Sequence, residues 1–369
     1  MMSVKGTSAS GMTTEHGCAQ RMRALRRHFL QSSMGLGMGL GAVGLTQLSS
    51  ASNQAGAGAW STALVTQERF MVGFGTQLSI SASHEDKSLL ERALEAAVGR
   101  LRHIESVMSL FLQDSAVSQL NRSGYLQKPD PDLLAVLRLA QSVSTQSAGA
   151  FDITVQPLWR LWRQTSLENR LPGASELRQA QSLVAWQDLE VSEEQVRFKR
   201  PGMGLTLNGI AQGYACDQAR MTLKAKGIEH ALLDLGEWSS LGKANDIGVA
   251  HPRRDNELLA TVNLQGRNPG LAQSLATSSD AQMSFTRDHR YHHIFDPNTG
   301  ASPGLAASVS VVAESCALAD SLTKVFFMEA SKSTGFDQWV DRSKVLCQFW
   351  GVEVILADKT GTVWSNVSS

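Results

Sequence analysis

From Phe70 to Lys359 the sequence alternates between short strand-like segments and amphipathic helices, and no linker divides it. The first segment, "FMVGFGTQLSISAS" (70–83), alternates and is rich in residues that favour strands. In the next, apolar residues recur at helical spacing from Leu90 to Met108, after a cap expected at Ser83. A chain of 369 residues, 42% of them hydrophobic, can bury a large core. We therefore expect one α+β domain over residues 60–369.

Turn and cap residues predict the remaining elements. Asp130 followed by Pro131 is typical of a helix start, and Gly227 of the end of a helix that begins at Ala211. Another helix is expected within 171–184. Strands are expected at 230–235, 257–264, 305–313, 343–349 and 352–357, and "DKTG" (358–361) as the turn of a final hairpin.

The first 59 residues have the layout of an export signal. Residues 1–30 carry five basic side chains and one acidic, and no charged residue occurs between Gln31 and Gln67. The run "RRHFL" (26–30) resembles the twin-arginine pattern, an address read by an export receptor. A membrane anchor is the alternative, but five glycines make the apolar stretch too weak for a stable span. We expect 1–59 to be a twin-arginine signal and linker, and the mature chain to reach the periplasm.

Charge and cysteine content exclude two classes of protein. Beyond residue 30 the chain has 29 basic and 33 acidic residues, so it lacks the basic stripe of a nucleic-acid-binding protein. Cys216, Cys316 and Cys347 are too sparse for a disulfide scaffold, although one bridge is possible. No spacing of cysteines and histidines indicates zinc.

Two stretches could place backbone against a ligand. "LTLNGIAQGYACDQ" (205–218) predicts a strand that runs through Asn208 and Gly209 into a helix, whose N-terminus would favour an anion such as phosphate. "ALLDLGEWSSLG" (231–242) predicts a buried strand that breaks at Gly236 before Glu237. An ordinary strand–helix joint and an ordinary strand end are the alternatives.

Two further stretches carry side chains that could bind a metal or transfer a proton. In "VVAESCALADSLTKVFFM" (311–328), Asp320 lies among apolar residues, which is costly unless its charge is paired or bound to a metal. Thr323 and Lys324 lie on the same helix face, so a salt bridge to Lys324 and a metal site are both open. In "RYHHIFDPNTGASP" (290–303), histidine suits proton transfer, whereas Asp296 before a proline also fits an Asx turn.

Taken in order, these stretches resemble the FAD:protein FMN transferases, the ApbE-type flavin transferases. The resemblance covers nearly all of the mature chain. It rests on "FGTQLSI" (74–80), "MSLFLQDSAVSQLNRSG" (108–124), "GAFDITVQPLW" (149–159), "LNGIAQGYACD" (207–217), "LLDLGEW" (232–238), "LATSSD" (275–280), "YHHIFDPNTG" (291–300) and "SVSVVAESCALADSL" (308–322).

The resemblance implies a fold and a reaction. The fold is a single ApbE-like, T-fold-type α+β domain with mixed or antiparallel sheets, flanking helices, and FAD bound in a cleft between the sheets. The reaction is Mg²⁺-dependent transfer of FMN from FAD to a threonine hydroxyl of a periplasmic redox protein, with release of AMP. An FAD-binding carrier with little transferase activity is the alternative, and a hydrolase that cleaves FAD to FMN and AMP is a third possibility.

The resemblance also assigns residues. His293 is the candidate base, and Asp296 would hold its loop. The Ala211 carbonyl, Asp320 and Thr323 are the candidate metal ligands. The candidate FAD contacts are Phe74, Tyr125, Asn208, Gly209, Gln212, Gly213, Asp217 and Glu237.

Five residues depart from the family's pattern. Lys324 stands where most members have a threonine or serine after the metal aspartate, and Gln212 where many have lysine. Glu237-Trp238 replaces Gly-Asn or Gly-Asp, and Thr206 a common aspartate. Lys324 is the feature that favours the carrier alternative.

Overall fold

The computed structural model describes residues 64–242, 244–264 and 273–367. The predicted export signal, residues 1–59, lies outside the described residues. None of the helices in the described ranges is long and apolar enough to cross a membrane. Cys216, Cys316 and Cys347 are buried and free.

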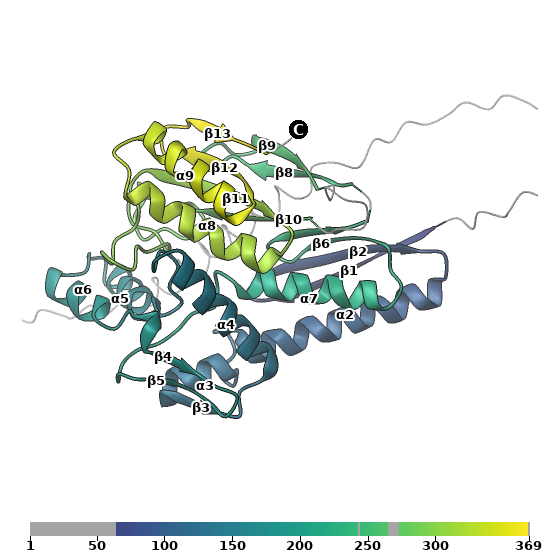
Figure 1. The fold of residues 1–369 in the computed structure, drawn as a ribbon, viewed down its shortest axis with the longest axis horizontal. Helices are drawn as coiled ribbons and strands as arrows, with labels where there is room; N and C mark the ends of the chain where they lie inside the picture. The colour runs from purple at the N-terminus through teal and green to yellow at the C-terminus, as the bar shows by residue number, and fades with distance from the viewer. Residues whose placement is uncertain (1–63, 243, 265–272, 368–369) are drawn as a thin grey trace, which may run out of the picture. The chain divides into compact units, whose positions relative to one another are not determined.

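An eight-stranded antiparallel sheet forms the centre of the fold (Figure 1). Its strands, in spatial order, are β1 (Val65–Gly73), β2 (Thr76–His84), β6 (His230–Asp234), β7 (Trp238–Leu241), β10 (Gln273–Ser279), β11 (Ala306–Ala313), β12 (Glu353–Asp358) and β13 (Val363–Ser365). A three-stranded sheet has the order β3 (Tyr125–Gln127), β5 (Gln195–Phe198), β4 (Leu189–Val191), and a hairpin joins β8 (Asp246–Ala250) to β9 (Leu258–Asn263). The strand pairs of the described chain are antiparallel throughout, as the predicted fold class allows.

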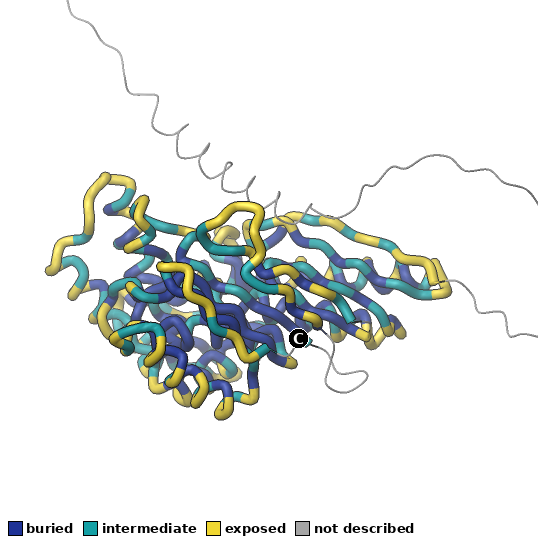
Figure 2. Tube along the Cα trace, turned by 90° about the horizontal axis from the view of Figure 1, so that it is seen from above, coloured by how far each residue is buried: buried dark blue, intermediate teal, exposed yellow. Residues whose placement is uncertain are grey.

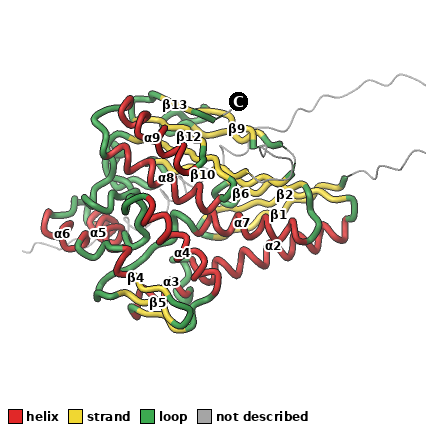
Figure 3. Tube along the Cα trace, viewed as in Figure 1, coloured by secondary structure: helices red, strands yellow, loops and turns green. Residues whose placement is uncertain are grey.

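The two faces of the large sheet are covered differently. Four helices pack on one face: α2 (Lys87–Met108), α7 (Ala211–Ala225), α8 (Cys316–Ser331) and α9 (Phe336–Trp350) (Figures 1 and 3). The β8–β9 hairpin covers part of the other face, where its apolar residues contact Leu275, Val312 and Ile355. Their chain neighbours Ala276, Val311 and Val354 belong to the core under the helices, as the alternation of side chains along a strand requires.

The remaining helices surround the small sheet and the chain between it and α7. They are α3 (Ala116–Ser123), α4 (Pro131–Gln146), α5 (Gln156–Leu167), α6 (Ala174–Gln181) and the short η1 (Trp186–Asp188). Burial is concentrated along the packed strands and helices, whereas the exposed residues lie mainly in turns and at loop tips (Figure 2).

Several predicted elements need correction. The strand expected at 343–349 is part of helix α9, whose buried residues Trp339, Val340, Ser343 and Cys347 recur at helical spacing. Residues 205–207 lead into α7 without forming a strand. The cap of α2 is Asp86, whose carboxylate accepts hydrogen bonds from the backbone of Ser88 and Leu89. The predicted start of α4, the end of α7 at Gly227 and the final hairpin are confirmed.

The single strand expected over 70–83 is a hairpin of β1 and β2. Its two turn residues, Phe74 and Gly75, both have positive φ angles, 50° and 81°, as in a type I′ turn. Such a φ is strained for phenylalanine, and the Phe74 N–H donates to Glu105 Oε1 at 2.7 Å. The ring of Phe111 covers Gly75, where a Cβ would lie 3.0 Å from it. The hairpin tip is therefore held in one conformation.

Helices α7 and α8 meet in a contact that admits no side chain at Gly213. A Cβ there would collide with the main-chain carbonyl of Cys316. One turn later, the Asp217 carboxylate accepts hydrogen bonds from the backbone N–H groups of Cys316 and Ala317, both at 3.0 Å, and from Ser315 Oγ at 2.8 Å. A carboxylate is favourable at a helix N-terminus, so Asp217 caps α8 from α7.

We expect Gly213→Ala to destabilise the protein by about 2 kcal/mol or more, because the added methyl group meets backbone that cannot rotate away. Urea unfolding of the purified chain measures this. Gly99→Ala is the matched control, since Gly99 is exposed on α2 and a Cβ there would meet no neighbouring element within 4 Å. Alanine there should stabilise by roughly 0.5–1 kcal/mol. Equal effects of the two substitutions would contradict the packing argument.

Candidate active site

One turn of α8 carries a buried ion pair. Asp320 is 1% exposed, and Lys324 Nζ lies 2.5 Å from its Oδ1 and 3.1 Å from its main-chain oxygen. The other carboxylate oxygen, Oδ2, is buried and has no hydrogen-bond partner in the described part of the chain. The salt bridge that the sequence left open is therefore present.

Thr323 does not join Asp320 at the carboxylate. Its hydroxyl lies 2.6 Å from the Asp320 main-chain oxygen and 2.7 Å from Ser278 Oγ on β10. The side chain is fully buried between α8 and the sheet. The hydroxyl therefore links the helix to β10, away from the position expected of a metal ligand.

The start of α7 lies against the same turn of α8. The Lys324 side chain fills the space beside Gly209, where a Cβ would lie 2.8 Å from Lys324 Cε. Asn208 is exposed next to it, and Ala211 is the first residue of α7. The structure thus brings together Asn208, Gly209 and the Asp320–Lys324 pair.

The turn between β6 and β7 completes this cluster. Gln212 Nε2 donates to the Leu235 oxygen at 3.3 Å and lies against Gly236, whose φ is +90°. Glu237 is buried, and its Oε2 accepts a hydrogen bond from the Thr277 N–H at 2.9 Å. Burial, and next the nearby charge of Asp320, raise the pKa of Glu237 well above its usual range, which favours the neutral carboxyl.

The tip of the β1–β2 hairpin adjoins this turn. The Thr76 methyl group lies 3.7 Å from where a Cβ of Gly236 would be. Phe74 precedes it in the turn and packs against the main core. Phe74, one of the predicted FAD contacts, therefore lies on the hairpin that borders the cluster.

Adjacent histidines in the loop between β10 and β11 have different roles. His292 is fully buried, and both ring nitrogens are used: Nε2 donates to the Pro303 oxygen at 3.2 Å, and Nδ1 accepts from the Ile294 N–H at 3.4 Å. His293 is half-buried, and its Nδ1 lies 3.1 Å from the Met283 oxygen. Because a carbonyl only accepts, Nδ1 of His293 carries the proton, and Nε2 of the neutral ring is free to take one.

The surroundings keep both rings neutral at physiological pH. Burial is the main cause that lowers the pKa of His292 to about 4. Burial, and next the charge of His292, lower the pKa of His293 to about 4. The charge of Lys324 adds a smaller contribution to the lowered pKa of His293.

Asp296 forms the turn that follows the histidines. Its Oδ1 accepts from the Asn298 N–H at 2.9 Å, its main-chain oxygen from the Gly300 N–H at 2.7 Å, and its Oδ2 from Ser331 Oγ at 3.0 Å. These contacts are those of an Asx turn tied to the end of α8. They fit the loop-holding role that the resemblance implies and offer no free group for proton transfer.

Sequence reasoning missed Asp280, the residue that begins the histidine loop. Asp280 is fully buried and pairs with Arg253 through two contacts, at 2.7 and 2.5 Å, while Lys359 Nζ lies 3.7 Å away. A bidentate arginine gives such a carboxylate a fixed orientation. The signal was a charged residue directly after a buried strand, but its partner lies in a distant loop.

Other predicted residues lie outside the cluster. Asp217 and Gly213 serve the contact between α7 and α8. Tyr125 is 51% exposed on β3 and lines a cavity of about 570 Å³. The basic side chains of that cavity are Arg122, Arg160, Arg197, Lys199 and Arg200. A second cavity of about 390 Å³ lies beside Asp296, and neither cavity is lined by His293 or Asp320.

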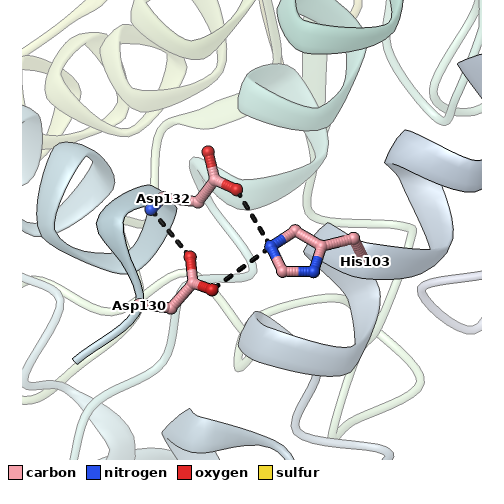
Figure 4. A group of neighbouring side chains, drawn as sticks. All are labelled: His103, Asp130 and Asp132. Carbon is pink, nitrogen blue, oxygen red and sulfur yellow. Dashed lines mark hydrogen bonds and ion pairs between the residues drawn. The ribbon is translucent and has the colours of Figure 1, made fainter. Parts of the chain in front are cut away.

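A separate group of ionisable side chains has the spacing of metal ligands. His103, Asp130 and Asp132 place one ligand atom each within 4.8 Å of one another (Figure 4). Arg100, however, contacts both oxygens of Asp132 at 2.5 Å, and Tyr214 donates its hydroxyl to the same carboxylate at 2.7 Å. The positive guanidinium already neutralises this carboxylate, so the group is explained as an ion-pair network.

The sequence is similar to those of several FAD:protein FMN transferases. An FAD:protein FMN transferase of Klebsiella pneumoniae (strain 342) is 27% identical over 236 residues, which are 61% of this chain and 70% of that protein. One of Treponema pallidum (strain Nichols) is 29% identical over 256 residues, 64% of this chain and 71% of the other.

Solved structures share the fold. The ApbE protein of Thermotoga maritima has a TM-score of 0.71 and 26% identity, covering 82% of this chain and 97% of its own. The Pseudomonas stutzeri flavinyl transferase ApbE, at 22% identity and a TM-score of 0.65, is similar in fold over 82% of this chain and 94% of its own. The model of the ApbE family matches residues 74–344. Since this range is well over half of the sequence, the chain belongs to the ApbE family.

Proposed function

We propose that this chain transfers FMN from FAD to a threonine hydroxyl of another protein. The relatives are named FAD:protein FMN transferase, and the observation that carries the proposal is His293, whose Nδ1 is held by the Met283 oxygen while its Nε2 has no hydrogen-bond partner among the described residues. The threonine oxygen would form a bond to the phosphorus of the FMN half. The bond from that phosphorus to the bridging oxygen would break, and AMP would leave with that oxygen.

The residues of the cluster have distinct parts in this proposal. His293 Nε2 takes the proton of the threonine hydroxyl, while the Met283 carbonyl holds the ring through Nδ1. The N-terminus of α7, reached through Asn208 and Gly209, favours the negative diphosphate. Asp280 holds the start of the histidine loop, and Asp296 holds the turn that follows the histidines.

We propose Mg²⁺ as the metal, entering with the diphosphate, because Mg²⁺ often binds through one or two carboxylates together with substrate phosphates. When bound, it would offset phosphate charge. The chain's own residues do not fit the ligand set that the resemblance implies. Lys324 holds Oδ1 of Asp320, and the hydroxyl of Thr323 is directed to Ser278. No step is therefore assigned to a metal held by Ala211, Asp320 and Thr323.

The site of action is also part of the proposal. The twin-arginine pattern at residues 26–30 supports export to the periplasm, with residues 1–59 as signal and linker and 60–369 as the transferase domain. A redox subunit of a membrane respiratory complex is the proposed acceptor, as the resemblance to the flavin transferases implies.

A carrier function is the second candidate, and the Asp320–Lys324 pair favours it. A protein that holds FAD beside a neutralised carboxylate would bind the dinucleotide without activating its diphosphate. Hydrolysis of FAD to FMN and AMP, with water in place of threonine, remains the third. Product analysis with and without an acceptor separates the three.

Transfer can be tested with the purified chain, FAD, Mg²⁺ and a domain that carries an exposed threonine. Mass spectrometry should find FMN added to the threonine, with AMP in equal amount. His293→Ala should slow this by about 10²–10⁴-fold, the usual contribution of a general base. His289→Asn is the matched control, since it changes a histidine of the same loop and asparagine tolerates its φ of 55°. Unchanged transfer in His293→Ala would contradict the assignment of His293 as the base.

The acidic limb of the pH profile gives a second test. A base works only when unprotonated, and its pKa of about 4 lies below the 6.5 of an ordinary histidine. We therefore expect kcat/KM to stay high as pH falls through 6 and to drop only near pH 4–5. Circular dichroism at each pH checks that the chain stays folded. A drop centred near pH 6.5 in folded protein would contradict the assignment.

A further inference from the structure

Lys324 occupies a position from which a positive charge faces the proposed diphosphate site. Its side chain is 20% exposed, so the ammonium is partly enclosed. It packs across Gly209, directly before the N-terminus of α7, where only a glycine leaves room for it. The positive ammonium of Lys324 and the positive N-terminal end of the α7 dipole therefore lie side by side, and both favour a bound anion.

The charges of the cluster leave little to attract a divalent cation. Asp320 and Lys324 cancel one another, and the raised pKa of Glu237 favours its neutral form. Mg²⁺ usually binds proteins through one or two carboxylates, and here the Asp320 carboxylate is already paired through Oδ1. An ammonium has three N–H donors that suit phosphate oxygens; in Lys324 two of them contact Asp320, which leaves one for a ligand.

The second observation is the unpartnered oxygen of Asp320. Oδ2 is buried and accepts no hydrogen bond from the described residues, although an unmet buried acceptor is costly. Its partner oxygen Oδ1 orients Lys324 at 2.5 Å. The carboxylate is thus placed to hold the ammonium and still has one oxygen that a bound ligand or its water can satisfy.

We infer that the ammonium of Lys324 is a built-in cation of this site, which takes the place of a protein-bound divalent metal and contacts the diphosphate of FAD. The inference rests on the proposed function, because it takes FAD to be the ligand. It makes Lys324 a binding residue and Asp320 its positioning residue. Mg²⁺ that enters with the substrate remains compatible with this arrangement, but FAD binding itself does not need it.

The test measures the dissociation constant of FAD for the full chain, from quenching of flavin fluorescence, in EDTA and in millimolar Mg²⁺. For the unmodified chain we expect tight binding in both. Lys324→Met should weaken binding by about tenfold or more in EDTA, since it removes a charge-assisted contact. Lys324→Thr should also bind weakly in EDTA and should regain affinity when Mg²⁺ is added.

Two further variants control for folding and for general charge effects. Lys332 forms a different ion pair at the end of α8, with its Nζ 2.7 Å from Glu329 Oε1. The Lys332→Met variant should bind FAD as tightly as the unmodified chain. Asp320→Asn combined with Lys324→Met removes both charges, so no unpaired charge is left buried. If Lys324→Met alone fails to fold, this double variant should fold and still bind FAD about tenfold more weakly.

The outcomes separate the inference from the function on which it rests. FAD binding that needs Mg²⁺ in the unmodified chain, or Lys324→Met and double variants that bind like Lys332→Met, would overturn the inference even if transfer occurs. Mg²⁺-independent binding that depends on Lys324, with no transfer to any acceptor, would support it and point to the carrier function. A chain that binds FAD in neither condition would overturn both.

Discussion

The cap that Asp217 of α7 places on α8 is the contact on which the arrangement of the site depends. These two helices come from segments about a hundred residues apart, and each carries part of the cluster: Gly209 and Gln212 lie just before and within the first turn of α7, and Asp320 and Lys324 lie on α8. Two backbone N–H groups and one hydroxyl bind a single carboxylate, and Gly213 lets the helix axes approach. A small shift at this joint would separate Lys324 from Gly209.

The buried ionisable groups around the site are either paired with an opposite charge or kept in their neutral form. Asp280 is paired with Arg253, and Asp320 with Lys324. Glu237 and the two histidines have no such charged partner in the described part of the chain, and burial shifts the pKa of each in the direction that favours its neutral form. This arrangement follows from the cost of burying an isolated charge. At the site itself, the ammonium of Lys324 is held in place by Asp320.

Much of the fold could be predicted from local sequence signals, and the failures have physical causes. The cap at Asp130 and the end of α7 at Gly227 were readable because each depends on one or two neighbouring residues. Residues 343–349 are too few for their periodicity to separate strand from helix, and of these only Ser343 and Cys347 belong to the buried face of α9, whereas Val345 and Phe349 are exposed. The turn at Phe74 was missed because asparagine or glycine, and not phenylalanine, is typical of its positive φ.

The site was harder to read, because a residue type does not reveal its partner. The resemblance assigns Asp217 and Gly213 to FAD, whereas their contacts in the structure serve the packing of α7 on α8. It marks His293 rather than its neighbour, and the hydrogen bonds of His292 explain why the neighbour is structural. The pairing of Lys324 with Asp320 was one of two possibilities that helical spacing allowed, and only the side-chain positions decide between them.

The contact between α7 and α8 restricts the residue type on the two helices to different degrees. At residue 213 only glycine fits, because the obstacle is main chain and cannot be exchanged. At residue 316 the group that makes the contact is a carbonyl, which every amino acid supplies. This contact therefore sets the residue type on α7, whereas on α8 other contacts set it, since Cys316 is fully buried and its thiol donates to the Trp238 oxygen at 3.8 Å.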